Sequence, residues 1–252
     1  MSRNHQSLDS LIEASKYRSK FSGHGNSKGA AGYRIEGDGQ HGSFLSNIGD
    51  SEIINRQKDN FKYIKISAAW DNIPPKRIGS FFKKLFRRTK ADLHKGVDID
   101  LGCLYELNNG KRGAVQAFGD IMGDYDNSPY IKLSQDERTG DTQGYDEYLL
   151  VNGAKWPEIK RILIYVYIYD GAPDWGSIRP QIQVQVPGEP PMIVVPNIYR
   201  SELGVCVIGS MENIRNGIKM TNHTEYFPGH NEMDRAFGFG LEWDDGQKKN
   251  PL

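Results

Sequence analysis

The chain has few cysteines, no long apolar run and no net charge. Its two cysteines, Cys103 and Cys206, are too few for a disulfide framework, so we expect a reduced, cytoplasmic protein. The longest uncharged apolar run is Ile162–Tyr169, far short of the roughly 20 residues that a membrane-spanning helix needs. No apolar stretch follows Met1, so we expect no secretory signal.

The charges balance overall but are unevenly distributed. The 252 residues include 32 lysines and arginines and 32 aspartates and glutamates, which argues against attraction of the whole protein to nucleic acid. Residues 76–95 are predominantly basic, whereas residues 96–147 are predominantly acidic. A cationic segment therefore lies directly before an acidic one.

Motifs of common catalytic sites are missing from the sequence. There is no G-x-S-x-G turn, no P-loop or dinucleotide glycine pattern, and no Cys/His spacing suited to zinc. His223 and His230 have acidic residues nearby in the sequence, but we expect them to flank the last strand and helix. Both cysteines lie in apolar strand patterns and are expected to be buried and unreactive. We therefore expect a protein that is not an enzyme.

Two regions differ in composition. Residues 1–58 are rich in glycine and serine and poor in apolar side chains, which predicts a flexible leader with one short helix. Phe44–Ile54 is the part of it that we expect to return to the domain as an edge strand. Residues 59–250 have the composition of a folded domain, and the basic segment 76–95 is an insert within it.

The folded part has the pattern of an all-β domain with few short helices. Short strands are predicted between turn residues, which is typical of an antiparallel β-sandwich or barrel. They cover residues 61–70, 97–107, 113–118, 148–151, 162–169, 181–186, 192–195, 204–211 and 218–226. Ile162–Tyr169 is apolar on both faces and predicts a central strand, whereas the alternation in Gln181–Val186 predicts one face in water. Helices are predicted over Trp156–Arg161 and Asn231–Phe237.

Paired carboxylates are the most specific chemical feature. Asp98 and Asp100 lie two residues apart on a predicted strand, so both should project from one face about 7 Å apart. Two such charges repel each other unless a cation or a proton lies between them. A second acidic segment, residues 136–147, has glycines that permit tight turns. Together they could supply the six to eight oxygens that calcium prefers, although ordinary solvated turns would have the same composition.

Several motifs resemble the TerD-type domain of bacterial tellurium-resistance and stress proteins. They are Ala68-Ala69-Trp70-Asp71, the segment Lys95–Gly102 and the segment Asp136–Glu147, while Gly102–Leu107 and Glu225–Asp234 look TerA-like. The resemblance covers about residues 59–245 and implies a β-sandwich that binds Ca²⁺. It makes Asp98, Asp100, Asp136, Asp141, Asp146 and Glu147 candidate metal ligands, with Asp71 as a weaker one.

The acidic turn departs from the family's usual Gly-Asp-Gly-Asp-Asp-Glu. Here Gln143 and Tyr145 stand where that pattern has two carboxylates. Fewer charged ligands should lower the affinity for calcium, and one of two ion sites could be lost.

The basic insert has helical spacing. Ile78, Phe81, Phe82 and Leu85 share one stripe, and most of the cationic side chains fall elsewhere. This pattern, strongest over Phe81–Lys90, is typical of a helix that binds an anionic membrane surface or an acidic partner. A helix packed on the domain itself, or a flexible loop, would satisfy the same pattern.

Three hypotheses follow. The preferred one is a cytoplasmic, calcium-binding stress-response protein that acts as a binding or scaffold module for other tellurium-resistance and stress proteins. In this hypothesis it lies in part at the inner face of the membrane and binds no nucleic acid. The alternative is a metal-dependent hydrolase or nucleotide-processing enzyme that uses the acidic cluster. The third is a structural β-sandwich whose acidic residues bind nothing.

Overall fold

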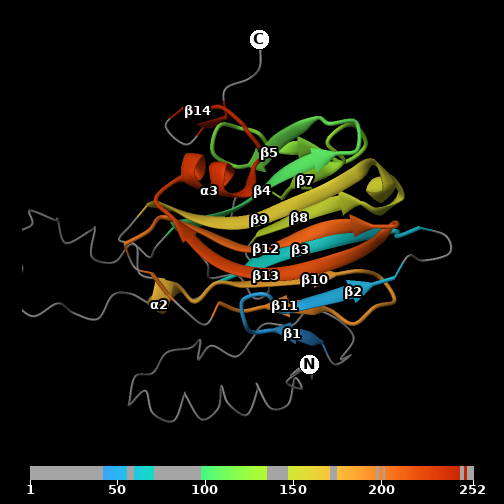
Figure 1. The fold of residues 1–252 in the computed structure, drawn as a ribbon, viewed down its shortest axis with the longest axis horizontal. Coiled ribbons are helices and arrows are strands. Elements are labelled where there is room, and N and C mark those ends of the chain that lie inside the picture. Colours follow the sequence, from blue (N-terminus) through green and yellow to red (C-terminus); the bar gives the residue numbers. More distant parts are fainter. Residues whose placement is uncertain are drawn as a thin grey trace, which may run out of the picture.

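Two β-sheets face each other as a sandwich in the computed structural model (Figure 1). The structure describes residues 42–55, 60–70, 98–134, 147–170, 175–196, 199–200, 202–244 and 247–248. All strand pairs in the two large sheets are antiparallel except one. The predicted all-β sandwich is therefore confirmed.

The two large sheets have seven and six strands. The seven-stranded sheet has the order β1 (Ser43–Leu45), β11 (Met192–Val194), β10 (Gln181–Gln185), β3 (Tyr63–Ala69), β8 (Glu147–Asn152), β7 (Ile131–Leu133) and β6 (Gly123–Asp124). The six-stranded sheet has the order β2 (Ser51–Ile54), β13 (Gly217–Phe227), β12 (Val205–Ile214), β9 (Ile159–Asp170), β4 (Asp98–Leu107) and β5 (Arg112–Gln116). A separate ladder joins β14 (Trp243–Asp244) to β15 (Gln247–Lys248). The helical elements are η2 (Gly153–Glu158), α2 (Trp175–Ile178) and α3 (His230–Phe237).

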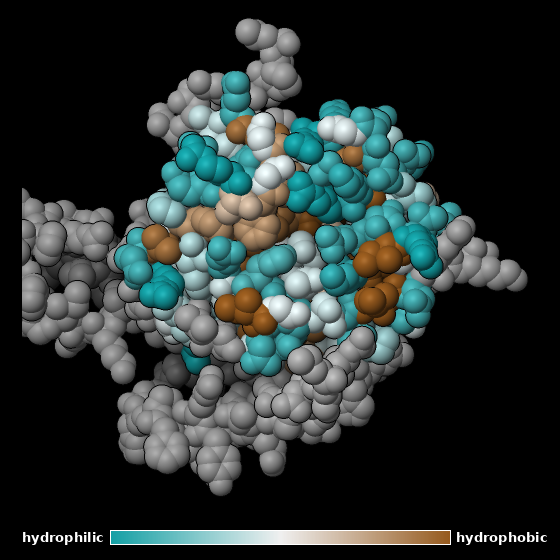
Figure 2. All heavy atoms as spheres, in the orientation of Figure 1, coloured by the Kyte–Doolittle hydropathy of each residue, from teal (hydrophilic) through white to brown (hydrophobic). Residues whose placement is uncertain are grey.

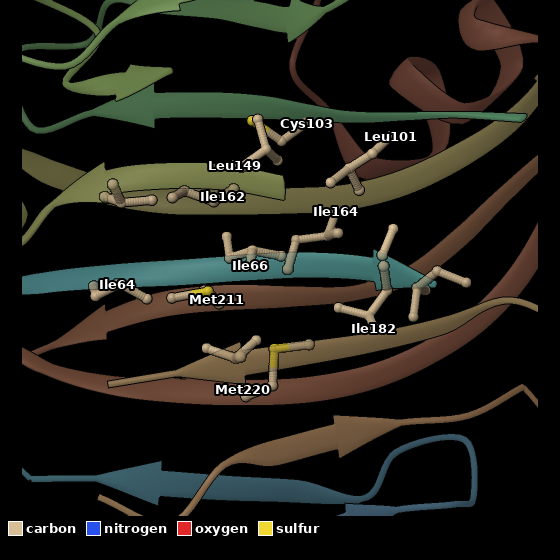
Figure 3. Packing of buried hydrophobic residues seen from close by; sticks show 14 of the residues in the cluster. Ile64, Ile66, Leu101, Cys103, Leu149, Ile162, Ile164, Ile182, Met211 and Met220 are labelled. Carbon is tan, nitrogen blue, oxygen red and sulfur yellow. The ribbon is translucent and has the colours of Figure 1, made fainter. Parts of the chain in front are cut away.

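The main core lies between the two sheets. Alternate apolar residues of each strand share one face, so the period of two in the sequence sends one set of side chains inward. Figure 3 shows these side chains meeting between the layers, with Ile64 and Ile66 from β3 facing Leu101, Ile164 and Met211 from the opposite sheet. The positions that predict the strands are thus the positions that build the core.

The central strand β9 is buried on both faces, as predicted. Ile162, Ile164 and Val166 lie in the core between the sheets. Tyr165 and Tyr167 alternate with them and lie in a second apolar cluster on the outer face of the six-stranded sheet. Helix α3 and the residues that follow it cover that outer face (Figure 1). This second cluster is why the strand is apolar at every position.

Two sequence predictions are corrected by the structure. The helix predicted over Trp156–Arg161 is a 3-10 helix that ends at Glu158, because residues 159–161 already pair with β4 and β12 as part of β9. The face of Gln181–Val186 that was expected to meet water is also buried, with Gln183 fully inaccessible. Strand β10 lies inside its sheet, between β11 and β3, and burial of its polar side chains requires hydrogen-bond partners.

The strand expected over Phe44–Ile54 is in fact two strands. β1 is the outermost strand of one sheet and β2 the outermost strand of the other, so the short connection between them crosses from one layer to the next. The amide of Asn222 donates to Leu45 O at 2.9 Å, and its backbone bonds with Gly49 and Asp50. The sandwich therefore includes residues ahead of the boundary at residue 59 that composition suggests.

Apolar side chains on the face shown in Figure 2 form separate patches among hydrophilic ones. The exposed large apolar residues include Ile48, Ile53 and Ile214. Within the described ranges no helix combines the length and the hydropathy needed to cross a bilayer.

Candidate functional site

One end of the sandwich gathers the chain segments that border the acidic residues. Ala68, near the end of β3, pairs with Glu147 at the start of β8. In the other sheet Asp98, at the start of β4, pairs with Asp170 at the end of β9. Ser134 and Tyr148 flank the acidic segment, and they are joined by a backbone bond of 2.8 Å and by a bond of 3.0 Å from Tyr148 N to Ser134 Oγ. The acidic segment therefore leaves and re-enters the sheet at the same place.

A hydrogen bond joins the two acidic regions. The backbone N–H of Leu101 donates to Glu147 Oε2 at 2.6 Å, across 46 positions of sequence. Glu147 is fully buried and lies on the same face of β8 as Leu149 and Val151, toward the main core. The carboxylate that ends the acidic segment thus lies against the strand that carries Asp98 and Asp100.

Asp100 lies on the opposite face of β4. Its neighbours Ile99 and Leu101 are in the core between the sheets, so Asp100 is directed to the outer face of the six-stranded sheet. It is buried and is the cross-strand partner of Tyr167. Burial, together with the nearby Asp100 carboxylate, raises the pKa of Tyr167, so the phenol is neutral near pH 7.

The other predicted ligands are less fully described. The register shifts between Asp98 and Ile99, so the regular alternation behind the paired-aspartate prediction is interrupted there. The remaining predicted ligands, Asp71, Asp136, Asp141 and Asp146, lie outside the described residues, as does the basic segment 76–95. Among the residues that the structure describes, no three acidic, histidine or cysteine side chains form a group able to hold a metal.

The described donors suit a hard cation. Asp100 and Glu147 offer carboxylate oxygen, the ligand type that calcium prefers. Asp170 is a further acid that sequence reasoning missed, placed beside Asp98 by strand register. Only the pairing of β4 with β9, which the sequence does not specify, could have identified it.

An aromatic cluster surrounds His230 next to Asp100. The His230 ring lies 4.9 Å from the Tyr167 ring and 5.4 Å from the Tyr165 ring, edge to face in both cases. It stacks on Trp243 at 4.9 Å. Burial lowers the pKa of His230 to about 4, so the imidazole is neutral near pH 7. His230 packs in this cluster at the start of α3, close to the position that the sequence suggests.

His223 has a different environment. Its Nε2 lies 2.9 Å from Ser210 Oγ on the neighbouring strand, and its ring packs edge to face on Phe237. Burial lowers its pKa, and the carboxylates of Glu225 and Glu212 oppose this effect. Cys103 and Cys206 are free, buried thiols whose pKa is raised by burial, which leaves them without thiolate character near pH 7.

An ion cluster around the buried Glu106, which sequence reasoning missed, lies at the other end of β4. Glu106 accepts from Arg161 Nε at 2.7 Å, Lys160 Nζ at 2.9 Å and Arg112 at 3.2 Å. Burial opposes ionisation of Glu106, but these hydrogen bonds outweigh it and lower its pKa to about 2. Arg161 also donates to the carbonyls of Phe237 and Gly238, so the cluster fixes the end of α3 on the sheet.

Comparison with known proteins gives one informative match. No family model matches the chain. A curated protein of Alcaligenes sp., described as tellurium resistance protein TerA, is 34% identical over 192 residues. The match covers 76% of this chain and 54% of the relative. The chain therefore spans about half the length of the curated relative that it matches.

Proposed function

The chain is a TerA-like member of the tellurium-resistance family, and from this we propose that it is a calcium-binding protein of the stress response. The proposed site is the end of the sandwich where β4 and β8 begin. The observation that carries the proposal is the bond from Leu101 N to Glu147 Oε2, which joins the end of the acidic segment to the paired-aspartate strand. Calcium would be held at the start of β4 by carboxylate oxygen of the acidic segment and Asp98, together with Asp100 or Glu147, which lie on opposite faces of that strand.

The energetics of burial support a cation at this end. Asp100 and Glu147 are both buried, and a buried carboxylate is costly unless hydrogen bonds or a positive charge compensate it. The backbone of Leu101 supplies a neutral donor to Glu147. A divalent ion bound at the same end would add a positive charge close to these carboxylates.

We propose a binding role rather than a catalytic one. Bound calcium would stabilise the folded domain by an amount that grows with the logarithm of the calcium concentration above Kd, and it would fix the segments around the site into one surface. Other tellurium-resistance or stress proteins are the proposed partners of that surface. The basic segment Phe81–Lys90 is proposed to add contact with an anionic membrane surface at its cytoplasmic face.

Calorimetric titration with calcium tests the proposal. The full chain should bind Ca²⁺, its melting temperature should rise with added Ca²⁺ and fall with EGTA, and Asp100→Asn should weaken binding. Asp126→Asn is the matched control, because Asp126 is an exposed carboxylate in the turn before β7. Identical melting in Ca²⁺ and EGTA, with no heat of binding, would refute calcium binding.

A vesicle flotation assay tests the membrane contact separately. Vesicles with anionic lipid should carry the wild-type chain upward, and neutral vesicles should not. Changing Lys83, Lys84, Arg87 and Arg88 to glutamate should abolish flotation. Equal flotation of this variant and the wild type would exclude the basic segment as the contact.

A further inference from the structure

We propose that Ser210 is an activated nucleophile, with His223 as its general base, and that it accepts an acyl group from an activated ester or thioester. The pair lies on the neighbouring strands β12 and β13, on the outer face of the six-stranded sheet (Figure 1). The proposed reaction goes beyond the proposed function, because it needs neither calcium nor the acidic segment.

The two side chains are in direct contact. Ser210 Oγ lies 2.9 Å from His223 Nε2. In the tautomer that carries its proton on Nδ1, the imidazole accepts this bond from the hydroxyl, which is the arrangement of a serine nucleophile and its general base. Both residues are partly exposed rather than enclosed in the core. Burial lowers the pKa of His223, although Glu225 and Glu212 oppose this effect, so the ring is neutral near pH 7 and able to accept a proton.

The backbone at this pair departs from regular β structure. His223 and Thr224 of β13 together oppose the single residue Ile208 of β12, which makes a β-bulge. Thr224 has a φ of 41°, in the left-handed region that a β-branched residue rarely enters. Bulges change the direction of side chains, and strained residues are concentrated at functional sites. Here both features occur at the imidazole that contacts Ser210.

A second hydroxyl lies on the same face beside Ser210. Thr221 is the direct partner of Ser210 across the two strands, so the two side chains project from one face of the sheet. Thr221 Oγ1 is buried and has no hydrogen-bond partner in the part of the chain that the structure describes. An unpaired buried hydroxyl is uncommon. In this position it is a donor available to the negative oxygen that forms when a carbonyl is attacked.

An aromatic side chain flanks the pair. The Phe237 ring, at the end of α3, packs edge to face on His223 with 5.1 Å between the ring centres, and it also packs on Phe227. These contacts restrict the plane of the imidazole. Phe237 is only partly buried, so it also offers an apolar surface to the carbon chain of an acyl group. This surface is the reason for proposing an acyl donor as the reactant.

In the proposed transfer, the Ser210 oxygen bonds to the carbonyl carbon of the donor while the bond from that carbon to the leaving oxygen or sulfur breaks. The hydroxyl proton passes to His223 Nε2 and then to the leaving group, which departs as an alcohol or a thiol. The product is an ester at Ser210, and neither an oxidant nor a reductant is consumed. A single transfer of this kind modifies the protein and requires no turnover.

Acetylation by p-nitrophenyl acetate tests the proposal in the full chain, with EGTA present to remove calcium. Peptide mass mapping at short times should locate the first acetyl group on Ser210, with an initial burst of p-nitrophenol. Ser210→Ala should abolish this label, and His223→Gln should slow it about 100-fold, which is a usual size for general-base assistance. Ser51→Ala is the matched control, because Ser51 pairs with Thr221 from β2 and shares the same face. It should be acetylated at the wild-type rate.

The position of the label in the wild-type chain decides the question even where a variant does not fold, because it needs no substitution. First acetylation at another residue, or no acetylation of Ser210, would overturn the proposal. Equal rates for the wild type and a folded His223→Gln variant would overturn the role of the histidine and with it the activated pair. The melting temperature of each variant identifies those that are folded.

Discussion

Arg161 and Glu106 are paired through a bond of 2.7 Å on the outer face of the six-stranded sheet, where the Glu106 side chain is only 4% exposed. Arg161 also lies over the ring of Phe239, with its guanidinium carbon 4.1 Å from the ring centre. One arginine therefore contacts the sheet, the end of α3 and the segment after it. Protonation of Glu106 at low pH, or its replacement by mutation, should therefore weaken the contacts of Arg161 with the sheet, with the end of α3 and with the segment after it.

Glu106→Gln should remove part of the acid sensitivity of folding. The folded-state pKa of Glu106 is about 2 against an ordinary 4.5, so its ionised form stabilises the fold above pH 4.5 and this contribution is lost as the pH falls toward 2. The contribution should be about 3 kcal/mol. Chemical unfolding between pH 2 and 7 measures it, with the exposed Glu158→Gln as control. An unchanged acid limb in Glu106→Gln would contradict the prediction.

His230 should impose a second, higher pH dependence. Its folded-state pKa is about 4 against 6.5, so the unfolded chain binds the extra proton between these values. Stability should be complete above pH 6.5 and should fall by about 3 kcal/mol as the pH drops to 4. His230→Phe keeps an aromatic ring and should flatten the curve in this window. The same slope in the variant would assign the effect to other groups.

Gly102→Ala should destabilise the fold without touching any charge. A Cβ at Gly102 would lie 2.6 Å from atoms of the Tyr165 ring, and that ring is fully buried. Overpacking of this kind costs about 1–3 kcal/mol, because the ring has no free space to enter. Gly204→Ala, where the new atom would be 3.7 Å from the nearest neighbour, is the control. Urea unfolding that shows equal stability for both variants would contradict this account.

Glu147→Ala should weaken the fold even in EGTA. It removes the acceptor of the Leu101 N–H inside the sandwich, and an unsatisfied buried amide costs about 1–3 kcal/mol. Glu147→Gln keeps a carbonyl oxygen at the same position and should lose much less. Unfolding of the two variants without calcium separates this structural effect from any loss of metal binding. Equal losses would show that the carboxylate charge, rather than the acceptor, is what matters.

Much of the fold could be predicted because burial in the longer strands follows from the local pattern of apolar residues. Ile64, Ile66 and Ala68 alternate with less apolar residues, and the burial they predict is what the structure shows. The short strands β6 and β7 lacked such a signal, since two or three residues are too few to reveal a period. Gln183 was misjudged because its burial depends on tertiary packing, which the local alternation does not show.

The site was harder to predict than the fold. The sequence singles out Asp100 and Glu147 as candidate ligands, but it could not show that they approach β4 from different faces. The partners that matter, Tyr167 and the Leu101 amide, come from pairing across the sheet and between the layers. Such pairings depend on long-range register, and local patterns contain little information about it.

The turn that joins β1 of one sheet to β2 of the other has a consequence for how the domain unfolds. β1 and β2, which are joined by one short turn, form an edge strand of each large sheet. Ile48 in that turn is 57% exposed. A protease cut at that turn would release the two rim strands from each other at once. Local unfolding would then begin at β1 and β2 and continue into their neighbours β11 and β13. We therefore expect the intact turn to raise the free energy of local unfolding on that side.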